Sequence, residues 1–253
     1  MPTHLELSRH LDGFREAATA IVAYAGRAGL DAAVPTCPDW NVLDLVAHQG
    51  MVHRWARALV RRETPMDDEV AAFEHAGRTS ADPLAWLEEG ADELAREIIA
   101  APEDLTTFVF LNDAPPARRF WARRQCHETT MHAIDALAAS LGRAPEADEV
   151  WVDAELAGDG IDELLCGFLT RPRSRLRCDD EALLVVRPDD LPDWWDVSMG
   201  PRPAVTTRRT TGDEPPDDPD WELTGSAVEL HLRLWNRTDP PEQWQPLTAV
   251  TWS

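Results

Sequence analysis

The stretch ARRFWARRQCHETTMHAIDALAASL, residues 117–141, predicts a long helix that ends at Gly142. At about 100° per residue, Glu128 and His132 lie one turn apart on the same helix face. The string is not the zinc-protease motif HExxH, because that motif needs two histidines four positions apart and His127 and His132 are five apart. The stretch therefore predicts a carboxylate and an imidazole that could share one metal ion.

A third candidate ligand lies on another predicted helix, which begins after Asn41, a residue that favours helix N-termini. His48 occupies a position in the apolar seam of this helix. A histidine in such a seam is either a hydrogen-bonded core residue or a ligand. The seam is formed by Leu45, His48, Val52, Trp55 and Leu59.

Together, His48, Glu128 and His132 would provide two imidazoles and one carboxylate, with a fourth position left open. This number and type of ligands are typical of catalytic zinc. Asp135, three residues beyond His132, could accept the second N–H of that imidazole, or it could pair with a surface arginine. A hydrogen-bonded Glu-His-His cluster without metal is the alternative.

Two further amphipathic helices are predicted in the first half of the chain. One has its apolar positions between Leu7 and Ala25, and the other opens at Asp82-Pro83 and continues to about Ile98. Four such helices favour an antiparallel four-helix bundle.

The pattern changes after about residue 148. A helix-like stretch over 153–169 precedes short strand candidates and a late helix over 227–235; the strand candidates are 182–186, 194–198, 204–207 and 221–224. We therefore expect two domains: a metal-binding helical bundle over 1–148 and a small α+β domain over 149–253.

The chain is strongly acidic. Asp and Glu number 46 against 24 basic residues, all of them Arg, and the formal net charge is −22. This charge repels polyanions, and no basic cluster is dense enough to override it, so we expect no nucleic-acid partner.

The N-terminal sequence, MPTHLELSRHLDGF, lacks a long apolar run, so we expect no signal peptide. No stretch approaches the roughly 18 apolar residues of a membrane span. The four scattered cysteines indicate free thiols in a reducing compartment. We expect a cytoplasmic monomer.

Three stretches resemble the mycothiol-dependent maleylpyruvate isomerase family, which belongs to the wider group of DinB-like metal-binding bundles. VPTCPDWNVLDLVAHQGMVHRWA, residues 34–56, resembles the family's first signature, and RRQCHETTMHAIDA, residues 123–136, resembles its HExxxHxxDA signature. GSAVELHLRLWNR, residues 225–237, resembles the closing motif of the second domain, with Asn236 in place of a Gly.

The resemblance implies zinc on His48, Glu128 and His132, with the fourth position open to water or to the thiol of mycothiol. It also implies that an arginine of the second domain, here matched by Arg237, assists catalysis.

These features lead to three hypotheses. In the first, the metal activates a low-molecular-weight thiol for attack on an electrophile, and the outcome is isomerisation or S-transfer. In the second, the protein is a zinc hydrolase that activates bound water, which needs a separate general base because Glu128 is spent as a ligand. In the third, the metal only stabilises a non-catalytic binding protein.

Overall fold

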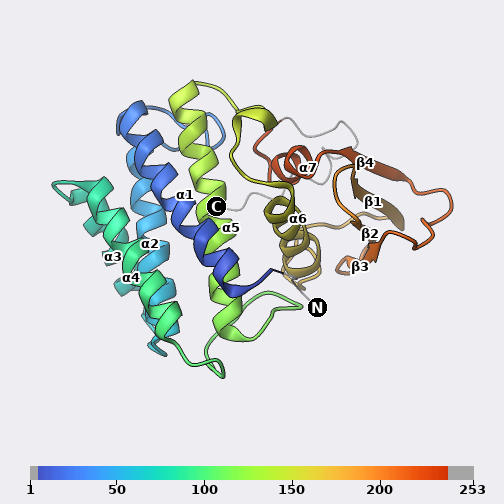
Figure 1. The fold of residues 1–253 in the computed structure, drawn as a ribbon, viewed down its shortest axis with the longest axis horizontal. Helices are drawn as coiled ribbons and strands as arrows, with labels where there is room; N and C mark the ends of the chain where they lie inside the picture. Colours follow the sequence, from blue (N-terminus) through green and yellow to red (C-terminus); the bar gives the residue numbers. More distant parts are fainter. Residues whose placement is uncertain (1–4, 239–253) are drawn as a thin grey trace. The chain divides into compact units, whose positions relative to one another are not determined.

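The computed structural model describes residues 5–238, which form two compact units (Figure 1). A helical unit comprises residues 5–109 and 115–145, and a mixed unit comprises residues 110–114 and 146–238. The division into domains 1–148 and 149–253 stays a prediction. No helix among the described residues is both long and apolar enough to cross a membrane.

The helical unit is built from four long helices that pack on one another, with a fifth, shorter helix beside them. α1 packs against α4 and α5, α2 packs against α4 and α5, and α3 packs against α2 and α4. Their bounds are α1 (Leu7–Ala28), α2 (Val42–Val60), α3 (Asp67–Thr79), α4 (Pro83–Ala100) and α5 (Ala117–Leu141).

Local signals at the helix ends explain where the helices begin and stop. The Asn41 side chain accepts a hydrogen bond from the Asp44 N–H while the Asp44 carboxylate accepts one from the Asn41 N–H, which forms a capping box at the start of α2. Asp82 caps α4 ahead of Pro83. Gly142, in the left-handed conformation at φ 71°, ends α5 at the predicted position.

Helix α3 was not predicted, because it has no apolar stripe and only Gly77 is buried among its residues. Trp86 of α4 lies where α3 meets α2. The indole lies against Gly77 of α3 and Gly50 of α2, and a Cβ at either glycine would overlap the ring. The Arg54 guanidinium stacks on the same indole, 3.7 Å from its centre.

The mixed unit contains a four-stranded sheet in the order β3-β2-β1-β4, with β4 parallel to β1 and the other pairs antiparallel. Helix α7 packs against α6 and lies beside β1 and β4. The elements are η1 (Ala147–Glu149), α6 (Ala154–Asp162), η2 (Glu163–Phe168), β1 (Ala182–Pro188), β2 (Asp193–Met199), β3 (Val205–Thr210), β4 (Trp221–Gly225) and α7 (Ala227–Leu234).

A buried carboxylate joins the helices of the mixed unit to its sheet. Asp162, at the end of α6, accepts hydrogen bonds from Trp195 Nε1 of β2 at 2.9 Å and from Arg208 Nη2 of β3 at 2.8 Å. Directly after it, η2 continues the chain as a π-helix, a conformation that is rare outside single turns. The ion pair therefore fixes the helix to two adjacent strands.

The predicted fold class, a helical bundle followed by a small α+β part, is confirmed. All four predicted strands form, and the late helix forms over 227–234. One prediction about the second helix is wrong: His48 is not in the core seam. It is partly exposed, while Gln49 and His53 are fully buried. The helix is rotated by about one residue from the predicted seam because polar side chains occupy part of its buried face.

We expect Gly50→Ala to lower the free energy of unfolding by about 1–3 kcal/mol, since the new methyl group would overlap the Trp86 ring. Gly26→Ala is the matched control. A Cβ there makes only an ordinary contact, 3.6 Å from Leu84, and alanine favours the helix. Chemical denaturation of both variants measures the difference, and equal stabilities would contradict the proposed docking of α3.

Candidate metal centre

The structure brings the three predicted ligands together. His48 comes from α2, and Glu128 and His132 come from α5. One potential ligand atom from each lies within 4.8 Å of the other two. The imidazole rings of His48 and His132 have their centres 5.2 Å apart, and His132 Nε2 is 3.6 Å from Glu128 Oε1.

The second nitrogen of His132 is held by a buried carboxylate. His132 Nδ1 lies 3.0 Å from Asp135 Oδ2, and the Asp135 side chain is fully buried. The Thr36 hydroxyl donates to Asp135 Oδ1 at 2.6 Å. This arrangement favours a proton on Nδ1, and Nε2 is the ring nitrogen that faces Glu128. Of the two placements considered for Asp135, the structure has the one beside His132.

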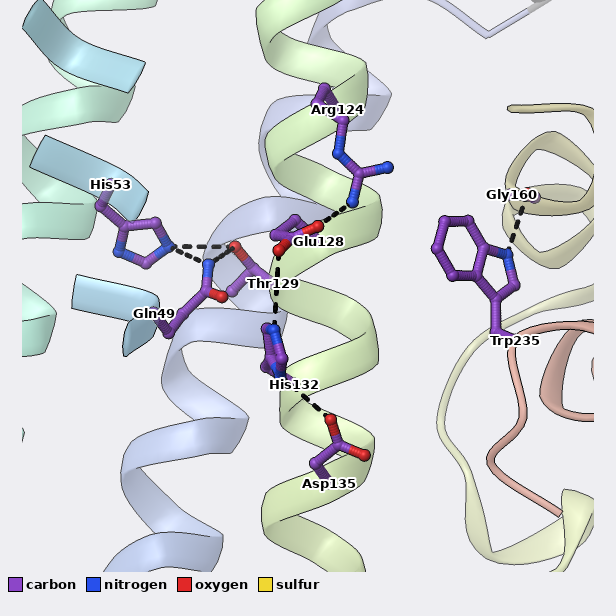
Figure 2. A network of polar contacts seen from close by, with 9 residues as sticks. All are labelled: Gln49, His53, Arg124, Glu128, Thr129, His132, Asp135, Gly160 and Trp235. Carbon is purple, nitrogen blue, oxygen red and sulfur yellow. Dashed lines mark hydrogen bonds and ion pairs between the residues drawn. The ribbon is translucent and has the colours of Figure 1, made fainter. Parts of the chain in front are cut away.

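A line of polar contacts runs along one face of α5 (Figure 2). Arg124 Nη2 contacts Glu128 Oε2, one turn before His132. Arg124 is only 2% exposed, whereas the Glu128 side chain is 26% exposed. Sequence analysis missed Arg124, although the spacing of four residues to Glu128 could have indicated the pair.

Burial and neighbouring charges shift the pKa values of the three side chains in different directions. Burial raises the pKa of Glu128, but Arg124 and the two imidazoles outweigh it, so its pKa lies below the usual range. Burial lowers the pKa of His48 to about 4, and the charge of His132 adds to the effect. Burial also acts to lower the pKa of His132, but the contacts with Asp135 and Glu128 outweigh it, and the pKa of His132 is raised. At neutral pH the cluster therefore offers an ionised carboxylate and a neutral imidazole.

The loop before α2 covers one side of the cluster. Its Trp40 is half-buried and lies against both histidines, with ring centres 4.8 Å from His48 and 5.7 Å from His132. Cys37 lies in the same loop, half-buried and not in a disulfide. It is not in the group formed by His48, Glu128 and His132 among the described residues.

A second buried polar network lies beside the cluster and joins α2 to α5 (Figure 2). Gln49 Nε2 lies 2.8 Å from His53 Nε2 and donates to Thr129 Oγ1 at 3.0 Å, and His53 Nε2 is also 3.0 Å from Thr129 Oγ1. Burial lowers the pKa of His53 to about 3, so this imidazole is neutral. Residues 49 and 129 directly follow two of the ligands, and the network fixes their helices against each other.

Arg237, the predicted catalytic residue, belongs to the mixed unit. Its side chain is largely buried, and its Nη1 donates to the Trp235 carbonyl oxygen at 2.7 Å. Trp235 in turn donates from Nε1 to the Gly160 carbonyl oxygen at 3.2 Å (Figure 2). These contacts fix the segment after α7 within its own unit, and the role of Arg237 stays a prediction.

The donor set fits zinc. Two imidazole nitrogens and one carboxylate oxygen converge, one imidazole carries a buried carboxylate partner, and no fourth protein ligand joins the group among the described residues. Three protein ligands with an open position are typical of catalytic rather than structural zinc.

The cluster lies inside a stretch of the chain that matches a known family. A family model described as the mycothiol maleylpyruvate isomerase N-terminal domain matches residues 11–137. Two solved structures, of a mycothiol-dependent maleylpyruvate isomerase and of a single-residue mutant, are similar in fold. Each has a TM-score of 0.61 and covers 92% of this chain and 90% of its own, at 14% and 13% identity respectively. No protein with a curated description matches the chain.

We expect Thr129→Val to lower the free energy of unfolding by about 1–3 kcal/mol, because the buried Gln49 amide and His53 imidazole lose a hydrogen-bond partner. Thr19→Val is the control: its hydroxyl bonds the Arg15 carbonyl oxygen on an exposed part of α1. Both changes have the same effect on side-chain volume. A similar small loss in both variants, measured by denaturation, would show that the network contributes little.

Proposed function

Since the chain belongs to the family of the mycothiol maleylpyruvate isomerase N-terminal domain, we propose that it is a zinc-dependent enzyme that activates mycothiol for attack on a small electrophile. The observation that carries this proposal is the convergence of His48, Glu128 and His132. The family is one of enzymes that use a low-molecular-weight thiol, and this cluster lies within the matched residues.

A zinc ion held by these three side chains would supply Lewis acidity, which lowers the pKa of a thiol toward neutrality. The chain's own residues prepare the site for it. Asp135 fixes the orientation of the His132 ring, and burial keeps His48 neutral, so His48 can bind the ion without first losing a proton. The Trp40 indole covers one side of both rings, which restricts the directions from which ligands approach.

In the proposed reaction, the thiolate sulfur adds to an electrophilic carbon, and the adjacent double bond becomes single. If the adduct rotates and the S–C bond then breaks, the double bond reforms with changed geometry and the thiol is regenerated. If the S–C bond persists after protonation of the adjacent carbon, the product is a thioether. The family name favours the first outcome, isomerisation.

We also propose Arg237 as the catalytic residue of the mixed unit. Its guanidinium can bind a carboxylate of the electrophile through two parallel hydrogen bonds. Support comes from the resemblance of residues 225–237 to the family's closing motif.

We expect about one zinc per chain in the wild-type protein by elemental analysis, and little in His132→Ala, which loses one of three ligands. His75→Ala, at an exposed position of α3, should retain the wild-type metal content. Absence of metal from wild-type protein that was never exposed to chelators would overturn the zinc proposal and leave a hydrogen-bonded cluster.

With zinc bound, we expect conversion of a maleylpyruvate-type electrophile to depend on added mycothiol, because the sulfur is the attacking atom. Removal of zinc by a chelator should abolish turnover, and zinc should restore it. The measurement is the absorbance change of the electrophile. Cleavage of esters or amides without any thiol would favour the hydrolase hypothesis, and turnover unaffected by metal removal would overturn the proposed mechanism.

A further inference from the structure

Helix stability does not explain why Arg124 is buried beside Glu128. Arg124 is 2% exposed, and its guanidinium contacts Glu128 four residues later in the same helix. An acidic residue followed by a basic one is the favourable order for such pairs, and here the order is reversed. Burying a guanidinium also carries a large desolvation penalty. The pair therefore gains little as a helix-stabilising device.

The two oxygens of the Glu128 carboxylate have different neighbours. Oε2 accepts from Arg124 Nη2, and Oε1 faces His132 Nε2 at 3.6 Å (Figure 2). A metal-binding carboxylate can coordinate through one oxygen or through both. An oxygen that is engaged by a charge-assisted hydrogen bond is a poor candidate for a second metal bond.

We propose that Arg124 is a positioning residue that restricts Glu128 to one metal-binding oxygen and so keeps a coordination position available for the thiol. The inference rests on the proposed metal site. With a single oxygen from Glu128, the three side chains supply three donor atoms, which leaves the fourth tetrahedral position to an incoming sulfur. A carboxylate bound through both oxygens would add a fourth donor atom and crowd that position.

Charge supports the same assignment. Arg124 lies one turn before Glu128, and Asp135 lies three residues after His132. The positive charge of Arg124 thus offsets the negative charge of Asp135, and the inner set of His48, Glu128 and His132 carries a single negative charge. A divalent ion there would retain one positive charge, which favours a thiolate as the next ligand.

Cobalt(II) in place of zinc tests this inference, because its visible absorption depends on coordination number whereas d¹⁰ zinc is silent. The full-length chain would be loaded with one cobalt ion, and its spectrum recorded before and after addition of 2-mercaptoethanol. We expect intense four-coordinate bands in the wild-type protein and a spectral shift on adding the thiol.

In Arg124→Met, which keeps the apolar stem but removes the donor, we expect the molar absorption to fall at least about twofold and the response to the thiol to weaken. Arg124→Lys should restore the wild-type spectrum, because one charged donor suffices for Oε2. Arg118→Met is the matched control. That arginine is on the same helix and bonds the Ile98 and Ile99 carbonyl oxygens, so its spectrum should not change.

If Arg124 has only a structural role, Arg124→Met should lower the melting temperature and leave the cobalt spectrum unchanged. That result would overturn the inference. Loss of cobalt from a folded methionine variant would also contradict it. Wild-type protein that binds no cobalt would overturn the metal site itself, whereas identical spectra in both proteins would overturn only the role of Arg124. If circular dichroism shows that Arg124→Met does not fold, Arg124→Gln carries the same comparison, since its shorter neutral side chain supplies no charge to Oε2.

Discussion

Along one face of α5, four charged and polar side chains lie in a row, and each one contacts the next. Arg124, Glu128, His132 and Asp135 follow at spacings of four, four and three residues, which keeps them on one side of the helix. In this poorly solvated position an unpaired charge is expensive, so removing one member would leave its neighbour uncompensated. Two of the three proposed metal ligands, Glu128 and His132, are therefore placed on one face of a single helix by the helical period.

The third ligand depends on how α2 is placed against α5. Glycines at positions 50 and 77 allow the Trp86 indole to approach α2 and α3 closely. The buried hydrogen bonds of Gln49 and His53 to Thr129 then fix the rotation of α2, because hydrogen bonds are directional where apolar contacts are not. His48, next to Gln49, is turned toward His132 as a result.

The family model ends at residue 137, and all three proposed ligands lie inside it. The mixed unit, with its Asp162 ion pair and the segment that holds Arg237, lies beyond it. The proposed metal centre therefore rests on the local geometry of residues inside the family match, while the proposed role of Arg237 rests on a resemblance of sequence.

The sequence by itself determined most element types and the pairing of Glu128 with His132, because the helical period decides which residues of one helix are neighbours. It also determined where α2 begins and where α5 ends, since Asn41 and Gly142 act locally. Only the tertiary structure decided that α3 forms, that His48 lies at the edge of the core, and that Gln49, His53 and Thr129 meet. The rotation of one helix against another depends on side chains far apart in the chain, and no period within a single helix records it.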